Sequence, residues 1–303
     1  MMILAMAAAI AELTISGPAG PLAATLTDPG RNGPAVILVP GSGPTDRDGN
    51  NPLGVAGGIY RQLAEQLSVR GIATLRIDKR GIFGSKKAIA DPNKVSLADY
   101  AADVHGWAAL LRARGKPCAW IAGHSEGGLV ALVAAQEPAD ICGLILLAAP
   151  GRPLGAVLRE QLKPKLPAEM YADAEAAIVR LEHRQPVDPA TVPSPIAPLF
   201  NPAVQAYLTE MVVTDPAKLA AATRLPMLIV QGDADLQVSI ADARTLAAAR
   251  PDATLTMIDG INHLWKPATA GDAAANLATY SNADLSIDSR VAETIASFVS
   301  VKR

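Results

Sequence analysis

The chain has 303 residues, of which half are apolar and 18% are charged, and its formal net charge at pH 7 is −2. This length allows one large α/β domain with an inserted subdomain, and the composition is typical of soluble globular proteins. The near-neutral charge gives no electrostatic basis for binding nucleic acid or an anionic membrane surface.

The first eleven residues are apolar and end in Ala9-Ile10-Ala11, a small-x-small pattern typical of the end of a secretory signal. The stretch lacks a basic region and is too short to span a bilayer. We expect residues 1–11 to be a signal remnant, a disordered start or a strand-like start. The compartment therefore stays open between cytoplasmic and periplasmic or secreted. No other segment approaches transmembrane length.

Alternating strands and helices follow in chain order. Residues 12–16 and 21–27 alternate around a Gly-Pro-Ala-Gly turn and predict a β-hairpin. Apolar runs predict further strands at 35–39, 72–77, 118–122, 143–148, 227–230 and 254–258. Helical patterns occupy 59–70, 97–113, 127–136, 240–249 and 287–299. Strands that alternate with helices predict a mostly parallel sheet with right-handed crossovers and flanking helices, an α/β fold.

A shift in composition interrupts this alternation. From residue 152 to residue 222 no strand pattern appears, and helical patches at 169–183 and 204–211 are separated by proline-rich sequence. Proline cannot continue a helix or join the middle of a sheet. We therefore predict a helical cap at 152–222, inserted into an α/β core formed by 12–151 and 223–303.

A serine lies between the strand at 118–122 and the following helix, in the segment Gly123-His124-Ser125-Glu126-Gly127-Gly128. A serine on a sharp strand-to-helix turn presents its hydroxyl above the sheet, where a base and a substrate can reach it. The turn crowds the neighbouring backbone, which explains the small residues on both sides. Ser125 is therefore the candidate nucleophile.

Candidates for the base and the acid follow two later strands. A serine hydroxyl needs an imidazole base, and the imidazole needs a carboxylate that fixes its tautomer. Of the four histidines, His105, His124 and His183 precede the acid loop, and only His263 follows it. The order Ser, Asp, His is the order of strand-turn-helix serine hydrolases. In Gln231-Gly232-Asp233-Ala234-Asp235 we favour Asp235 as the acid and Asp233 as a turn residue.

Two backbone amides are candidates for an oxyanion hole, which stabilises the negative oxygen of a tetrahedral intermediate. One is the amide of Glu126, at the positive end of the helix that follows the nucleophile. The other is the amide of Ser42, in the flexible loop at 40–43. Residues 46–50 lack the spacing of a calcium loop, and the Gly-rich loops lack a phosphate-binding lysine, so we predict no metal site there. The sequence leaves open whether Arg47 pairs with Asp78.

The two cysteines, Cys118 and Cys142, each begin an apolar run and show no metal-ligand spacing. If the runs are adjacent parallel strands, a disulfide is geometrically possible. We nevertheless expect two small buried thiols, because free cysteine behaves as a buried apolar residue.

These motifs together resemble the α/β-hydrolase superfamily, and within it bacterial serine carboxylesterases. The resemblance spans most of residues 12–301. The segments that carry the resemblance to the superfamily are Val39-Pro40-Gly41-Ser42-Gly43, Asp78-Lys79-Arg80-Gly81, Gly123-His124-Ser125-Glu126-Gly127-Gly128, Gln231-Gly232-Asp233-Ala234-Asp235 and Asn262-His263. The narrower resemblance to the carboxylesterases is carried by Pro40-Gly41-Ser42-Gly43-Pro44-Thr45-Asp46-Arg47-Asp48-Gly49-Asn50 together with the Ser125 segment. The resemblance implies an eight-stranded sheet with a helical cap after the sixth strand, and acyl-ester hydrolysis without a cofactor. Many relatives carry His-Gly where this chain has Pro40-Gly41, a change that keeps the donor amide.

The expected function is hydrolysis of small carboxylic esters with short acyl groups, through an acyl-enzyme. Leu154, Met211 and Trp265 are candidates for the substrate pocket. A thioesterase, or an aminopeptidase-like amide hydrolase, is the alternative on the same fold; the latter needs carboxylates for an ammonium group, from Glu126 or from Glu160, Glu169, Asp173 and Glu175. A ligand receptor without activity is a third hypothesis. The oligomeric state stays open.

Overall fold

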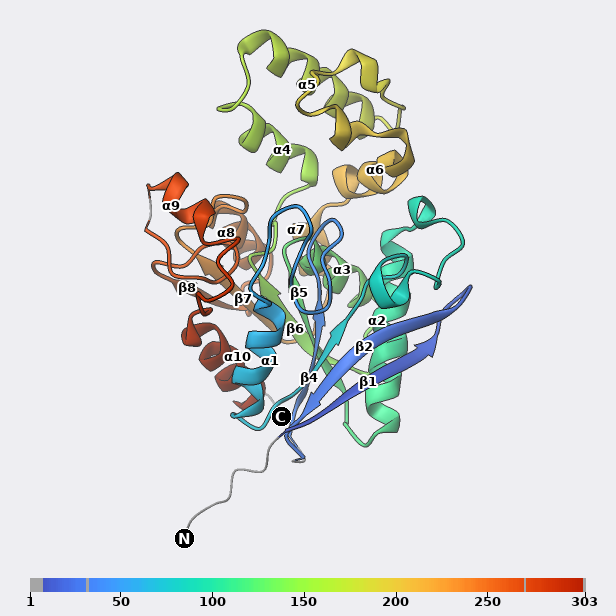
Figure 1. Ribbon diagram of the computed structural model, residues 1–303, viewed down its shortest axis with the longest axis vertical. Helices are drawn as coiled ribbons and strands as arrows, with labels where there is room; N and C mark the ends of the chain where they lie inside the picture. Colours follow the sequence, from blue (N-terminus) through green and yellow to red (C-terminus); the bar gives the residue numbers. More distant parts are fainter. Residues whose placement is uncertain (1–7, 31–32, 270, 302–303) are drawn as a thin grey trace.

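The computed structural model describes residues 8–30, 33–269 and 271–301, and its centre is one eight-stranded sheet (Figure 1). The strand order is β1-β2-β4-β3-β5-β6-β7-β8, with β1 and β2 antiparallel to their neighbours and the other strands parallel. The strands are β1 (Ala9–Ser16), β2 (Pro21–Asp28), β3 (Ala35–Val39), β4 (Ala73–Ile77), β5 (Ala119–His124), β6 (Ile141–Leu147), β7 (Met227–Gly232) and β8 (Thr254–Ile258). The expected hairpin and the mostly parallel sheet are confirmed.

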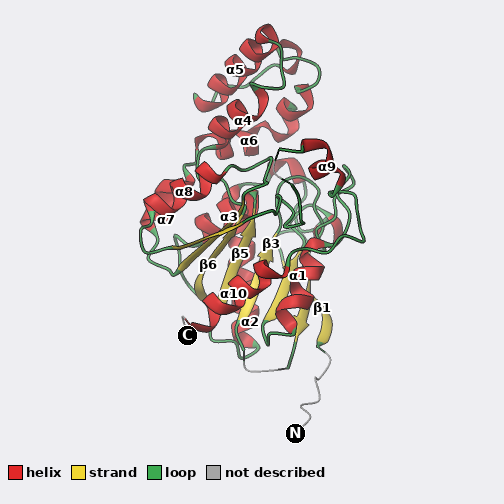
Figure 2. Ribbon diagram, turned by 90° about the vertical axis from the view of Figure 1, so that its left-hand side faces the viewer, coloured by secondary structure: helices red, strands yellow, loops and turns green. Residues whose placement is uncertain are grey.

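Helices cover both faces of the sheet (Figure 2). One face carries α1 (Ile59–Ser68) and α10 (Ser289–Val301), and the other carries α2 (Leu97–Ala113), α3 (Glu126–Ala134) and α8 (Ile240–Ala249). Side chains alternate between the faces along each strand. In β3, for example, Ile37 belongs to the α2 and α3 side, whereas Val36 and Leu38 belong to the α1 and α10 side. Each strand is therefore apolar on both sides, which explains the continuous apolar runs.

The inserted segment forms a helical cap above the carboxyl ends of the strands (Figures 1 and 2). Its helices are α4 (Leu154–Leu162), α5 (Ala168–Glu182) and α6 (Gln205–Val213), with three short 3-10 turns between α5 and α6. The cap has its own apolar cluster, which includes Ile178, Leu181 and Phe200. The last helix of the predicted insertion, α7 (Pro216–Ala222), packs instead on α3 and α8 of the core.

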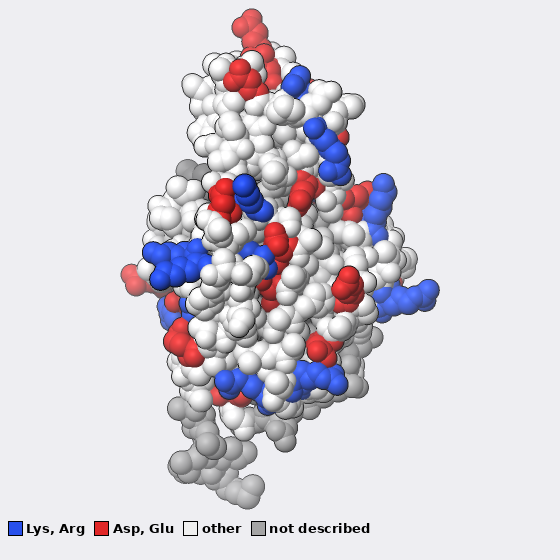
Figure 3. Space-filling model, turned by 90° about the vertical axis from the view of Figure 1, so that its right-hand side faces the viewer, with Lys and Arg blue, Asp and Glu red and all other residues white. Residues whose placement is uncertain are grey.

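Arginine side chains also hold the cap together. Arg159 of α4 forms ion pairs with Glu175 and Glu182 of α5, at 2.8 Å and 2.5 Å. On the face shown in Figure 3, basic and acidic side chains are interspersed over the cap and the core.

At the beginning of the chain, the described residues show the strand-like start, one of the three alternatives that the sequence left open. Ala9, Ile10 and Ala11 belong to strand β1, where they pair with Asp28, Thr27 and Leu26. Residues 1–7 of the expected remnant lie outside the described residues. Within the described parts of the chain, no helix is long and apolar enough to cross a membrane.

The prediction of two free thiols is wrong, because Cys118 and Cys142 form a disulfide, with their Cα atoms 5.3 Å apart. The two cysteines lie at the beginnings of the neighbouring strands β5 and β6. Ala119 pairs with Ile141 and Trp120 with Gly143, so the register shifts at Cys142. This irregularity accompanies a Cα separation within the range that a disulfide requires.

Candidate active site

Ser125 occupies the sharp turn between β5 and α3. Its backbone has φ 54° and ψ −123°, a conformation that is costly for a residue with a side chain and often marks a functional site. A Cβ atom at Gly123 would run into the backbone of Gly127, and one at Gly127 would run into the backbone of Val39. The turn can therefore form only because both positions are glycine, as the sequence pattern indicated.

His263 and Asp235 come from the loops after β8 and β7, respectively. The Nδ1 atom of His263 lies 2.8 Å from Oδ2 of Asp235, and both side chains are buried. Because a carboxylate only accepts, Nδ1 carries the proton in the neutral imidazole and Nε2 is left as the basic atom. The predicted base and the predicted acid are thus hydrogen-bonded to each other.

Several donors hold the Asp235 carboxylate. Its Oδ1 accepts the backbone N–H groups of Gln237 and Val238 at 2.7 Å and 3.0 Å, and Oδ2 accepts Gln231 Nε2 at 3.1 Å. Burial acts to raise the pKa of Asp235, but the charge and hydrogen bond of His263 and the two amides lower it overall. Asp235 therefore stays ionised near neutral pH. Asp233 instead accepts the backbone N–H of Gly260 at 2.6 Å and so fixes the turn before His263.

Ser125 and His263 line the same small cavity of about 120 Å³, together with Gly41 and Ser42. The fold thus brings Ser125 and His263, which are 138 residues apart in the sequence, to one edge of the sheet. His105 lies on α2, and His183 is an exposed residue at the end of α5, where its Nδ1 bonds the Val179 carbonyl. Neither of them lines the cavity.

A buried chain of hydrogen bonds passes through His124, the residue before the nucleophile. The Tyr60 hydroxyl lies 2.8 Å from Nδ1 of His124, and Nε2 of His124 lies 2.9 Å from the backbone carbonyl of His263. A carbonyl only accepts, so Nε2 donates to it and Nδ1 accepts the hydroxyl proton of Tyr60. The Tyr60 oxygen in turn accepts the backbone N–H of Gly41 at 3.0 Å.

This chain connects the loop of Ser42 to the backbone of the candidate base. Burial, and then the charge of His263, lower the pKa of His124 to about 3, so the ring stays neutral. Burial raises the pKa of Tyr60, which keeps its hydroxyl proton available. Sequence reasoning missed this arrangement. The available signal was a histidine at the end of a buried strand, but its partner Tyr60 lies on α1, 64 residues earlier in the chain.

Ser42 and Glu126, the residues of the two candidate oxyanion amides, line a common cavity with Ser125. In the described part of the chain, neither the backbone N–H of Ser42 nor that of Glu126 has a hydrogen-bond partner. Glu126 is the first residue of α3, where the helix dipole favours negative charge. Lys79 Nζ fixes the neighbouring loop because it donates to the Gly41 carbonyl at 2.7 Å.

The side chain of Glu126 belongs to a buried charge network beside these amides. Its Oε1 accepts Lys79 Nζ and the hydroxyl of Tyr207, both at 2.9 Å. Tyr207 belongs to α6, so this carboxylate ties the cap to the core next to the nucleophile. Lys79 also lies over the ring of Tyr100, with its Nζ 5.4 Å from the ring centre.

A second, larger cavity of about 260 Å³ extends from Ser125 beneath the cap. Leu154 and Met211, two of the predicted pocket residues, line it. The prediction for Trp265 is wrong, because this side chain is 2% exposed and lines neither cavity that contains Ser125. Its ring packs against His124, with ring centres 4.8 Å apart. The indole thus packs against the imidazole that lies in the middle of the buried hydrogen-bond chain.

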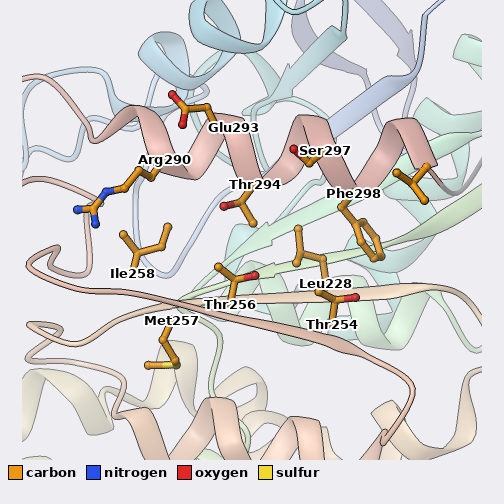
Figure 4. Close-up of a pocket in the computed structure, with 11 residues that line it drawn as sticks. Leu228, Thr254, Thr256, Met257, Ile258, Arg290, Glu293, Thr294, Ser297 and Phe298 are labelled. Atoms are coloured by element: carbon orange, nitrogen blue, oxygen red, sulfur yellow. The ribbon is translucent and has the colours of Figure 1, made fainter.

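A further cavity, of about 580 Å³, lies elsewhere, between α10 and the edge strand β8 (Figure 4). Side chains of α10 such as Thr294 and Phe298 face Thr256 and Thr254 of β8 there. None of the candidate catalytic residues lines it. It is therefore separate from the site at the carboxyl ends of the strands.

The other loops near the site have structural hydrogen bonds. Arg47 donates to Asp78 Oδ2 through Nε at 2.9 Å and Nη2 at 2.6 Å, so the pair that the sequence left open does form. Asp46 accepts the backbone N–H groups of Asp48 and Asn50, which is a turn rather than a calcium loop. No three His, Cys, Asp or Glu side chains of the described residues are grouped so that they could hold a metal ion.

Comparison with known families identifies the chain. The profile of the family described as serine aminopeptidase S33 matches residues 53–265, which include Ser125, Asp235 and His263. The chain belongs to this family of α/β hydrolases. Esterase EstD of Thermotoga maritima is 30% identical over 264 residues, which are 84% of this chain and 59% of EstD. The chain thus spans about three fifths of the length of this relative.

Solved structures share the fold. Esterase Pf2001 of Pyrococcus furiosus has a TM-score of 0.60 and 15% identity, over 97% of this chain and 90% of that one. Proline iminopeptidase of Mycobacterium smegmatis has a TM-score of 0.61 and 15% identity, over 96% and 98%. Est1E of Butyrivibrio proteoclasticus, solved with ferulic acid, has a TM-score of 0.58 and 19% identity, over 95% and 99%. At these identities the likeness concerns the fold alone, which is the predicted α/β-hydrolase fold.

Proposed function

We propose that this protein is a serine esterase that hydrolyses small carboxylic esters through an acyl-enzyme intermediate. Ser125 is the nucleophile, His263 the general base and acid, and Asp235 the group that orients the imidazole. The observation that carries the proposal is the hydrogen-bonded His263–Asp235 pair beside a serine held at φ 54°. The similarity to esterase EstD supports the ester as the substrate class.

In the first half of the reaction, the Ser125 hydroxyl oxygen attacks the ester carbonyl carbon, and its proton passes to Nε2 of His263. The negative oxygen that results accepts the backbone N–H groups of Ser42 and Glu126. As this intermediate collapses, the bond to the alkoxy oxygen breaks and His263 gives its proton to that oxygen. The alcohol leaves, and the acyl group stays on Ser125.

In the second half, water attacks the acyl carbon and gives a proton to Nε2 of His263. The acid is released when the carbon–Ser125 bond breaks and His263 returns the proton to the serine oxygen. Two backbone N–H donors aimed at the negative oxygen stabilise it by roughly several kcal/mol in such a site. No step of this sequence calls for a cofactor.

Amide hydrolysis with recognition of a free amino group is less well supported, despite the family's description. A substrate ammonium group needs an unpaired carboxylate, and Glu126 is already paired with Lys79 at 2.9 Å. In the cap, Glu160 and Glu175 are paired with Arg152 and Arg159. The other two candidate carboxylates, Glu169 and Asp173, are exposed on α5 and line neither cavity that contains Ser125. The charges around the site therefore do not favour an aminopeptidase.

The test is hydrolysis of p-nitrophenyl acetate and butyrate by the wild type and by Ser125→Ala. We expect the variant to lose at least a thousandfold in kcat, because removal of a triad member leaves only the oxyanion hole and binding. A fluorophosphonate probe should label the wild type and not the variant. Equal ester hydrolysis by both proteins would exclude Ser125 as the nucleophile, and an absence of both hydrolysis and labelling in the wild type would favour the receptor hypothesis.

A further inference from the structure

Ser125 lies at the boundary of two cavities of different size and lining, which we name the small chamber and the large chamber. The small chamber, of about 120 Å³, is lined by Thr45, Asn51, Val55 and His263 among others. The large chamber, of about 260 Å³, lies under the cap. Ser42, Ser125 and Gln237 line both chambers. An ester bound at Ser125 therefore has a separate place for each of its two halves.

The position of His263 decides which half occupies which chamber. The imidazole that takes the serine proton must give it to the alkoxy oxygen of the leaving alcohol, so the alcohol half lies beside that imidazole. His263 lines the small chamber and does not line the large one. The small chamber therefore holds the alcohol, and the large chamber holds the acyl group.

The volumes then limit the size of each half. An apolar cavity of about 150 Å³ holds a benzene molecule. The small chamber, at about 120 Å³, is below that size and suits an alcohol of only a few atoms. The large chamber, at about 260 Å³, exceeds it and accommodates an aryl ring or a chain of about six carbons.

The lining of the large chamber defines the chemistry of the acyl group. Most of it is apolar and comes from α3, α4 and α6, including Leu129, Val157, Leu158 and Leu208. Two charged side chains also line it, Glu126 and Arg152, and both are neutralised by partners. Glu126 pairs with Lys79 at 2.9 Å, and Arg152 pairs with Glu160 at 2.6 Å and Asp242 at 2.7 Å. No unpaired charge of the described residues there would bind a charged acyl group.

We propose that the preferred substrates are esters of a medium-sized, uncharged, apolar carboxylic acid with a short alcohol. This inference rests on the proposed esterase activity. It assigns the acyl group to the cap side and so makes the cap, through α4 and α6, the part of the chain that determines acyl specificity.

Two isomeric esters separate the two assignments. Ethyl hexanoate and hexyl acetate have the same atoms and primary alcohols as leaving groups, but the long chain is on opposite halves. We expect kcat/KM for ethyl hexanoate to exceed that for hexyl acetate by at least about tenfold, since even one methylene that does not fit changes kcat/KM by about 10-fold or more. An equal or reversed preference overturns the proposal, as does hydrolysis of p-nitrophenyl acetate with neither isomer cleaved.

A different result would refute the proposed esterase activity. If the wild type cleaves no ester at all, including p-nitrophenyl acetate, the esterase activity itself is refuted rather than the assignment of the chambers.

Variants of the two chambers give a reciprocal test. Met211→Trp fills part of the large chamber and should lower the ratio of ethyl hexanoate to ethyl acetate hydrolysis by about tenfold. Ala206→Trp places the same ring at an exposed position of the same helix and should leave that ratio unchanged. Val55→Ala widens the small chamber and should raise hexyl acetate hydrolysis relative to ethyl acetate. If Val55→Ala instead favours the longer acyl group, the assignment is reversed and the proposal fails.

Discussion

Acidification should destabilise this protein through His124. The ring is buried, its Nδ1 accepts a hydrogen bond from the Tyr60 hydroxyl, and burial lowers its pKa from 6.5 to about 3. Between these two values the unfolded chain binds a proton at this histidine and the folded protein does not. The free energy of unfolding is therefore unaffected by His124 above about pH 6.5, and it decreases progressively as the pH falls from there toward 3.

The magnitude follows from the shift. Lowering the pH from 6.5 to about 4.5 covers about two units, and each unit is worth about 1.4 kcal/mol, so the loss is about 3 kcal/mol. At about pH 4.5 the contribution of Asp235 is still largely present. Its folded pKa lies below 3.8, and its stabilisation is lost only as the pH falls through that lowered value.

The measurement is urea-induced unfolding at about pH 7 and about pH 4.5, for the wild type and for His124→Gln. Glutamine keeps an amide donor and does not titrate. All other titratable groups are the same in the two proteins, so the difference in their loss of unfolding free energy comes from His124. We expect the wild type to lose about 3 kcal/mol more than the variant between the two conditions. The same loss in both proteins would show that His124 is not held neutral in the folded state.

Three other substitutions test packing and covalent structure. Lys79→Met leaves the buried carboxylate of Glu126 without its cation and should lower the free energy of unfolding, measured by chemical denaturation, by about 3–5 kcal/mol. The double variant with Glu126→Gln should recover part of this loss. A wild-type denaturation midpoint for Lys79→Met would contradict the prediction. Replacing Cys118 and Cys142 by serine removes a disulfide between residues 24 positions apart and should lower the free energy of unfolding by about 3 kcal/mol. Dithiothreitol should lower the stability of the wild type but not that of the serine variant. Gly123→Ala adds a Cβ that runs into the backbone of the following helix, so it should abolish ester hydrolysis or folding, and a variant with wild-type kcat would show that the turn tolerates a side chain.

The sequence alone determined the local features of the fold. Continuous apolar runs predicted the parallel strands, alternation around a turn predicted the hairpin, and the segment around Ser125 predicted the turn between β5 and α3. Each of these features depends on residues that are close in the chain, where backbone sterics and the periodicity of side chains act directly. The helix α4 was not predicted, because it is short and the prolines around residues 154–162 are typical of irregular segments.

Tertiary structure alone decided how distant parts meet. Asp233 and Asp235 are two residues apart in one loop, and only the folded loop shows that Asp235 faces His263. The register irregularity between β5 and β6 accompanies the disulfide, and the approach of α1 joins Tyr60 to His124. These contacts depend on distances of a few ångströms between segments that are tens of residues apart. Such distances follow from how helices and strands pack, which no local pattern encodes.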